Sequence, residues 1–355
     1  MLLFWLGLLV TALPGAAIAL WLLGLYFYLC KRYLDFVIRI FQEKPLFVVP
    51  RGQPIEGAEE VRFPTTDGRT LAGCYLRARC ERRGVVLFGL EFGSNRWACV
   101  AYCQSLLENG YDVFAFESRG QGESDPLPGY EPLQWVTDFE VEDTRAALDY
   151  LKRRPDADPH GVGLFGISKG AGAGLLAAAA DPYVLCFVTD GVFGTYSTLV
   201  PYMRQWFRIY NDSHNMHGLL PSWYYGLVGL TALRRIEKER GCHYPQLETE
   251  LPKLGDRPLL LIHGGADTYI TPRIAGALYQ RVLGPKEFWL VEGAKHNGAL
   301  ALAGAAYERR VLEFFDRHLG RPLEQTREEP RRQPEVPAPQ AHPREESAKH
   351  ANAER

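Results

Sequence analysis

The sequence lacks an excess of either charge. Its 355 residues include 40 Lys and Arg against 42 Asp and Glu, so the formal net charge is only −2. Proteins that bind nucleic acid by electrostatic attraction carry a strongly basic surface. We therefore expect no nucleic-acid partner.

Patterns that would indicate a disulfide framework, a metal site or a nucleotide site are also missing. The number of cysteines is odd, and their spacing matches neither a disulfide-rich module nor a zinc site. The glycine-containing run "GISKG" at 166–170 lacks the spacing of a phosphate-binding loop. We expect no metal and no cofactor. The cysteines are Cys30, Cys74, Cys80, Cys99, Cys103, Cys186 and Cys242.

Charge is absent from the first 30 residues, which are mostly apolar. A bilayer-spanning helix needs about 20 apolar residues, so this run predicts a transmembrane anchor over residues 1–30. A cleaved signal peptide is the alternative, since small residues at Ala17-Ile18-Ala19 suit a cleavage site. The absence of a basic residue before the apolar run, and the continuation of that run past the cleavage site, favour an uncleaved anchor.

Basic residues follow the apolar run. Lys31, Arg32, Arg39 and Lys44 lie after it and none lies before it, so the positive-inside rule predicts a single-pass protein whose remaining chain is cytoplasmic. Residues 31–58 are interpreted as a juxtamembrane linker. Within it, "KRYLDFVIRIF" has helical apolar spacing that fits either a helix at the membrane surface or a helix packed on a core.

The pattern of the remaining chain indicates one α/β domain over residues 59–320. It begins with two strand-like runs around a turn at Asp67-Gly68. Short apolar runs without polar alternation then alternate with helical stretches, which is typical of a parallel sheet covered on both faces. The apolar runs are 85–88, 111–116, 162–165, 184–189, 259–262 and 288–291.

Two segments depart from this alternation. Residues 192–255 contain no strand candidate and many aromatic side chains, which predicts a helical lid insertion, with packing against the sheet as the alternative. Residues 321–355 are rich in Pro, Glu and Arg and poor in large apolar side chains. Such a composition predicts a disordered tail.

One serine stands between two glycines where an apolar run meets a small-residue run. In Gly166-Ile167-Ser168-Lys169-Gly170, the strand before and the helix after predict a sharp strand-to-helix turn. Glycine two residues to either side avoids a steric clash with the neighbouring strand and helix. Ser168 would then present its hydroxyl above the sheet edge, beside a helix N-terminus that stabilises negative charge.

A serine nucleophile needs a base, and the base needs an orienting acid. His296 follows the last predicted strand and is the candidate base, with His263 as a less favoured alternative. Asp267 follows the strand before it and is the candidate acid, with Asp190 as a rival. These side chains follow parallel strands, whose carboxyl ends hold the sites of open α/β sheets.

Five stretches together resemble the α/β-hydrolase superfamily, particularly its dienelactone-hydrolase and serine-aminopeptidase-like branches. The resemblance covers roughly residues 59–320 and implies an α/β-hydrolase fold with an eight-stranded, mostly parallel sheet. It also implies Ser168 as nucleophile, Asp267 as acid and His296 as base. The stretches are "FGLEFGSNRW", "ESRGQGES", "GISKG", "HGGADTYITP" and "EGAKHNG".

The resemblance further implies an oxyanion hole made of backbone amides. The Lys169 amide would be one donor and its side chain incidental. The second donor would be the Phe92 amide, with Glu91 next in line, although this chain has Leu90-Glu91 where relatives commonly carry His-Gly. We expect Glu91 to pair with Arg96, Arg119 or solvent, and Arg119 to have a structural role.

The implied function is a membrane-anchored serine hydrolase that cleaves an ester or thioester with an apolar acyl group. A serine peptidase of the same fold and an inactive, membrane-tethered binding module are the alternatives. The expected partners are the lipid bilayer and a small acyl substrate.

Overall fold

The fold is centred on an eight-stranded sheet. The computed structural model describes residues 2–44, 49, 51–210 and 222–321. Within that part of the chain the strand order is β1-β2-β4-β3-β5-β6-β7-β8. β1 and β2 pair in antiparallel orientation, as do β2 and β4. All other neighbouring strands are parallel. The strands are β1 Glu59–Pro64, β2 Thr70–Leu76, β3 Gly84–Gly89, β4 Tyr111–Phe116, β5 Val162–Ile167, β6 Val184–Asp190, β7 Leu259–Gly264 and β8 Lys286–Val291.

The predicted mostly parallel sheet is confirmed, and its burial explains the sequence pattern. Strands β3, β4, β5 and β7 are buried along their whole length, because helices cover both faces of the sheet. Continuous apolar runs are what such strands require. The edge strand β8 is more exposed.

Helices from the middle of the α/β domain cover one face of the sheet, and helices from its two ends cover the other. One core cluster joins the sheet to α3, α4, α7 and α8, and a second joins its other face to α2, α9 and α10. The prediction of helices on both faces is confirmed. These helices are α2 Cys99–Glu108, α3 Asp138–Arg153, α4 Lys169–Ala178, α7 Leu247–Glu250, α8 Pro272–Arg281, α9 Ala299–Ala303 and α10 Ala305–His318, with short 3₁₀ turns η1 Arg96–Ala98 and η2 Leu251–Leu254.

The segment between β6 and β7 is helical where it is described. It contains α5 Thr195–Tyr210 and α6 Ser222–Arg240 before α7 and η2. Residues 211–221 of the predicted lid insertion lie outside the described residues. The two helices pack on each other, and a third apolar cluster joins them to the loop around Trp135.

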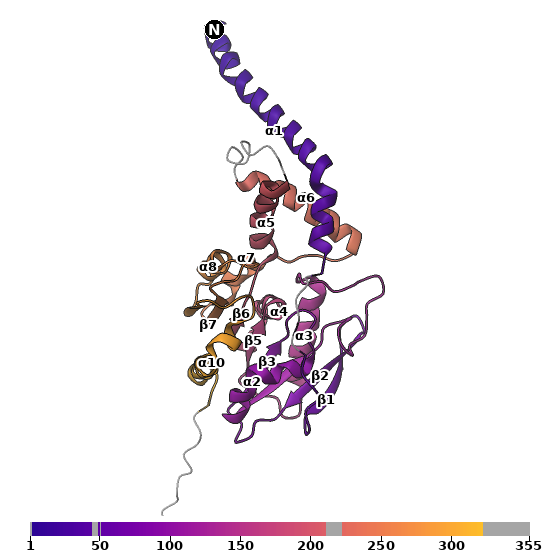
Figure 1. Ribbon diagram of the computed structural model, residues 1–355, viewed down its shortest axis with the longest axis vertical. Helices are drawn as coiled ribbons and strands as arrows, with labels where there is room; N and C mark the ends of the chain where they lie inside the picture. The colour runs from indigo at the N-terminus through magenta and orange to yellow at the C-terminus, as the bar shows by residue number, and fades with distance from the viewer. Residues whose placement is uncertain (1, 45–48, 50, 211–221, 322–355) are drawn as a thin grey trace, which may run out of the picture. The chain divides into compact units, whose positions relative to one another are not determined.

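The N-terminal helix α1 spans Leu2–Gln42 without a break, so residues 31–42 of the expected linker continue the same helix. α6 lies alongside it (Figure 1). The Tyr224 hydroxyl donates to the Leu22 carbonyl oxygen at 2.7 Å, and Arg235 pairs with Asp35 at 2.9 Å. Val37 and Phe41 are buried in the third cluster. This part of α1 is therefore packed on a core, as one of the two sequence interpretations proposed.

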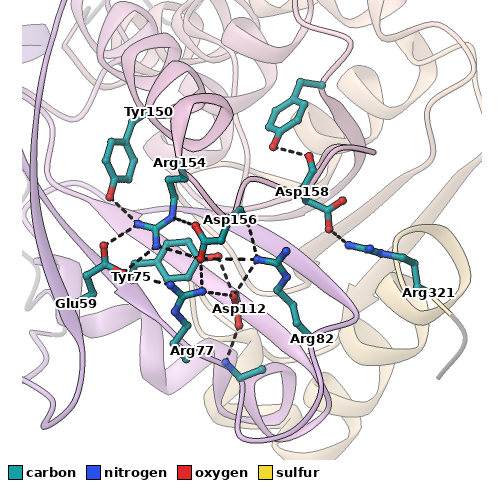
Figure 2. A network of polar contacts seen from close by, with 12 residues as sticks. Glu59, Tyr75, Arg77, Arg82, Asp112, Tyr150, Arg154, Asp156, Asp158 and Arg321 are labelled. Carbon is teal, nitrogen blue, oxygen red and sulfur yellow. Dashed lines mark hydrogen bonds and ion pairs between the residues drawn. The ribbon is translucent and has the colours of Figure 1, made fainter. Parts of the chain in front are cut away.

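A polar network lies at the end of the sheet where the parallel strands begin, opposite their carboxyl ends. Figure 2 shows Arg154, just after α3, between the carboxylates of Glu59 and Asp156, at 2.9 and 2.8 Å. Asp112, the second residue of β4, is buried and accepts a hydrogen bond from Tyr75 at 2.8 Å. Opposite charges alternate here, so the network is neutralised internally. Its role is to fix β1, β2 and α3 together.

The predicted tail falls outside this description. Residues 322–355 lie beyond the described part of the chain.

Candidate active site

Ser168 lies at a sharp turn between β5 and α4. Its φ of +50° and ψ of −114° are unusual for a residue with a side chain. A Cβ on Gly166 would lie 2.4 Å from the Ala171 Cα, and one on Gly170 would lie 2.3 Å from the Gly89 carbonyl carbon. Both glycines are therefore required by close backbone approach, as the sequence pattern predicts.

The structure brings Ser168, His296 and Asp267 together in that order. The Ser168 Oγ lies 3.0 Å from His296 Nε2, and His296 Nδ1 lies 2.7 Å from Asp267 Oδ2. The three residues come from the segments that follow β5, β8 and β7. Because these strands are parallel, their carboxyl ends meet at one edge of the sheet.

The Asp267 carboxylate is fixed by its own loop. Its Oδ1 accepts hydrogen bonds from the backbone N–H groups of Tyr269 and Ile270 at 2.8 and 2.9 Å. Its Oδ2 is thereby turned toward His296. The side chain is fully buried, so it contributes orientation and negative charge without contacting solvent.

His263, the alternative base, has a different environment. Its Nε2 lies 2.6 Å from the Ile270 carbonyl oxygen and 3.6 Å from Asp267 Oδ2. Burial lowers the pKa of its imidazole. The ring therefore supports the Asp267 loop, and His296 is the histidine that reaches Ser168.

Asp190, the rival acid, lies at the end of β6. Its backbone carbonyl accepts from the Ser168 N–H at 2.8 Å, and its Oδ2 accepts from the Tyr307 hydroxyl at 3.0 Å. Burial raises the pKa of Asp190 to about 7. Its carboxyl group is thus directed to Tyr307, whereas Asp267 contacts the histidine.

The expected oxyanion loop lies next to the serine. Glu91 and Phe92 line the same cavity as Ser168. A turn closed by the Ser94 N–H and the Glu91 carbonyl oxygen shapes the loop, with Gly93 at a φ of +81°. Lys169 is the first residue of α4, so its N–H has no acceptor within the helix.

The prediction that Glu91 pairs with Arg96, Arg119 or solvent is wrong. Its carboxylate accepts from the Asn297 side-chain amide at 2.6 Å, while Arg96 and Arg119 are held by other acidic groups. Burial raises the pKa of Glu91. Asn297 has a φ of +55° and directly follows His296. The pair links the two loops that flank the serine, a contact between distant segments that the sequence pattern did not indicate.

The Lys169 side chain is not incidental. Its buried ammonium donates to Glu140 Oε1 at 2.8 Å and to the Leu133 carbonyl oxygen at 2.6 Å. Against the effect of burial, Lys169 and Thr137 lower the pKa of Glu140. Glu140 also completes the capping box of α3 with Thr137. The capping-box motif Thr137-x-x-Glu140 is the feature of the sequence that could have pointed to Glu140.

Arg119 has the structural role that we expected. Its buried guanidinium contacts Asp143 at 2.7 Å and Asp67 at 2.9 Å. These contacts join the loop after β4 to α3 and to the turn between β1 and β2.

A mostly apolar cavity of about 360 Å³ opens beside Ser168 and His296. This volume lies in the range of small-molecule sites, about 300–1,000 Å³. Its walls come from α5, the loops after β3, β4, β6, β7 and β8, and the C-terminal part of α1. The contribution of α1 was missed, because nothing in the sequence shows where that helix packs. Among the described residues, no group of three or more His, Cys, Asp or Glu side chains could hold a metal ion.

Comparison with known proteins agrees with this architecture. A family described as the α/β hydrolase fold matches residues 85–214. The esterase Pf2001 of Pyrococcus furiosus superimposes with a TM-score of 0.58 at 23% sequence identity, covering 78% of this chain and 97% of that chain. The chain thus has the α/β-hydrolase fold, with an apolar N-terminal helix added.

Two curated relatives extend the comparison. The protein YfhR of Escherichia coli O157:H7 is 25% identical over 269 residues, which cover 73% of this chain and 80% of that protein. The thiohydrolase apmlB of Arthrinium phaeospermum is 32% identical over 132 residues, which cover 36% of this chain and 40% of that protein.

Proposed function

We propose that this protein is a serine hydrolase that cleaves a carboxylic ester or thioester through an acyl-enzyme on Ser168. The hydrogen-bonded series from Ser168 through His296 to Asp267 carries the proposal. A serine hydroxyl is a weak nucleophile at neutral pH, and an imidazole in contact with it accepts its proton as it attacks.

Acylation begins with attack of the Ser168 Oγ on the substrate carbonyl carbon, while His296 Nε2 takes the hydroxyl proton. Asp267 holds the other ring nitrogen and stabilises the imidazolium. As the tetrahedral intermediate collapses, the bond to the alcohol or thiol breaks and His296 returns the proton to that leaving group. The acyl group stays on Ser168.

Deacylation repeats these steps with water. His296 removes a proton from the water, whose oxygen attacks the acyl carbon, and then protonates Ser168 as the acid is released. In both halves, negative charge develops on the carbonyl oxygen. We assign its stabilisation to the backbone amides of Lys169 and Phe92, with Glu91 next in line.

The cavity and the relatives support an ester or thioester with an apolar acyl group. Phe193, Leu199 and Met203 present apolar surface beside the serine. The names of similar proteins include an esterase and a thiohydrolase. An apolar acyl chain is the substrate part that such a cavity buries favourably.

We also propose that α1 anchors the protein in a lipid bilayer and leaves the catalytic domain in the cytoplasm. Residues 13–42 are long and apolar enough to cross a membrane, and exposed basic residues follow the uncharged segment. A fusion of alkaline phosphatase after residue 320 tests the orientation. We expect no phosphatase activity, and strong activity would reverse the assignment. N-terminal sequencing of the mature protein would reveal cleavage after Ala19 if the segment were a signal peptide.

A fluorophosphonate probe tests the catalytic proposal directly. Wild-type protein should be labelled, with the Ser168 Oγ–phosphorus bond replacing phosphorus–fluoride, and Ser168→Ala should abolish labelling. Ser105→Ala, on α2 away from the cavity, is the matched control and should label normally. An unlabelled wild type would indicate a binding module instead. Efficient cleavage of peptide amides, abolished by Ser168→Ala, would indicate a peptidase.

A further inference from the structure

The C-terminal part of α1 lines the same cavity as the proposed nucleophile. Val37, Ile40 and Phe41 contribute apolar surface to this cavity, whose lining also includes Ser168 and His296. A helix that precedes the α/β domain in sequence thus supplies part of the substrate wall. Cleavage of an apolar acyl group would place that group against these side chains.

The wall is fixed to the domain by specific contacts. The rings of Phe41 and Trp135 stack at 4.4 Å between centroids with an interplanar angle of 3°. The Trp135 Nε1–H donates to the Phe41 carbonyl oxygen at 2.8 Å, and Gln134 donates to the Glu43 carbonyl oxygen at 3.1 Å. Carbonyl groups in the last turn of a helix find no N–H donor within it, so the bond to the Phe41 carbonyl oxygen also caps the C-terminus of α1.

The same helix carries the surface that suits a bilayer. Seven large apolar side chains between residues 13 and 28 are exposed on it. At a rise of about 1.5 Å per residue, Tyr28 precedes Val37 by roughly 14 Å along the helix. If this segment spans a bilayer, an acyl chain in the lipid would lie within a short distance of the cavity wall. The exposed residues are Leu13, Ile18, Leu20, Trp21, Leu23, Phe27 and Tyr28.

We infer that Val37, Ile40 and Phe41 set the length of the acyl chain, and that the substrate is an ester or thioester of a long-chain fatty acyl group. This inference rests on the proposed serine hydrolase. Burial of each added methylene against these side chains should raise the acylation rate by up to about fourfold. The N-terminal helix is then both the membrane anchor and a specificity element.

Fluorophosphonates with ethyl, octyl and dodecyl chains test the inference on the full chain in phosphatidylethanolamine and phosphatidylglycerol vesicles. Each forms the same bond with Ser168 and releases fluoride, so the labelling rates report chain recognition. Wild type should react fastest with the longer chains. Ile40→Trp, which fills the cavity, should lower the dodecyl-to-ethyl rate ratio about tenfold or more. Ile40→Ala should keep or raise that ratio.

Ile38→Ala is the matched control. Ile38 is buried on the same helix but does not line the cavity, so its truncation weakens packing of α1 without changing the wall. Its dodecyl-to-ethyl ratio should stay within about twofold of wild type. A wild type that prefers the ethyl probe, or a ratio that Ile38→Ala lowers as much as Ile40→Trp, would overturn the inference alone. A wild type labelled by none of the probes would overturn the proposed function as well.

Discussion

The ammonium of Lys169 lies 2.8 Å from the carboxylate of Glu140, and both side chains are buried. Lys169 directly follows Ser168, the proposed nucleophile, at the start of α4, and Glu140 lies in the first turn of α3. This ion pair joins the helix that begins directly after Ser168 to a neighbouring helix. It therefore fixes the position of the turn from which Ser168 projects.

Replacement of Lys169 by Met should destabilise the protein by about 3–5 kcal/mol, because Glu140 is left as an uncompensated buried charge. The measurement is the free energy of unfolding in urea. Lys253→Met removes an exposed partner of Glu250, at 2.7 Å, and should cost no more than about 1 kcal/mol. Equal losses in the two variants would contradict the role assigned to the buried pair.

Asp267→Asn should lower kcat by about three to four orders of magnitude, because an amide no longer stabilises the imidazolium or fixes the ring tautomer. Asp190→Asn should leave kcat within about threefold, because Asp190 contacts Tyr307. Ester hydrolysis by the two purified variants distinguishes the acids. A larger loss in Asp190→Asn would transfer the orienting role to Asp190.

The raised pKa of Asp190 predicts that the stability of the protein depends on pH. Its folded-state pKa of about 7 is raised above the unfolded value of about 3.9, so charging it opposes folding increasingly as pH rises from 4 to 7. Asp190→Asn removes this penalty. Its free energy of unfolding relative to wild type should rise across that window by up to about 4 kcal/mol and then level off. Urea unfolding at pH 5 and pH 8 measures the change, and a constant difference would refute it.

Gly170→Ala should destabilise the fold by several kcal/mol, because the new Cβ would meet the Gly89 backbone at 2.3 Å. Gly276→Ala is the matched control on α8, where an added Cβ meets nothing within 4 Å. This control should stabilise the protein by about 0.5–1 kcal/mol through helix propensity. Thermal unfolding compares the two, and a stable Gly170→Ala protein would argue against the close approach.

The lowered pKa of Asp156 predicts a contribution to stability that is lost in acid. Asp156 lies at the end of the sheet where the parallel strands begin. Against the effect of burial, Arg154 and Arg77 lower its pKa to about 2. The stabilisation is present above the unfolded pKa of about 3.9 and is lost as pH falls through 2. Asp156→Asn should lower the free energy of unfolding in urea by roughly 1–2 kcal/mol at pH 7 and by no more than about 0.4 kcal/mol at pH 2.

The control for this prediction is Asp149→Asn, which weakens exposed pairs at 3.5 Å and should change little at either pH. Esterase activity should be unaltered in both variants at pH 7. The network lies where the parallel strands begin, whereas Ser168 lies beyond the carboxyl end of β5. Loss of activity in Asp156→Asn without loss of stability would contradict that separation.

The fold could be predicted because its signals are local. Buried parallel strands need continuous apolar residues, and a serine between glycines marks a turn whose close packing excludes a Cβ. The sequence therefore predicted the parallel sheet and the turn at Ser168. It also predicted which loops carry Asp267 and His296, since each directly follows an apolar run.

Contacts between distant segments could not be predicted in this way. The order of the strands does not specify which side chain meets Glu91, and packing placed Asn297 there instead of an arginine. Likewise, the apolar spacing of residues 31–41 indicates a helix with a buried face but not its partner. Local sequence thus determined the elements and the turn that presents Ser168 to the cavity. Tertiary packing decided that Lys169 pairs with Glu140 and that α1 completes the cavity, because burial depends on what lies opposite.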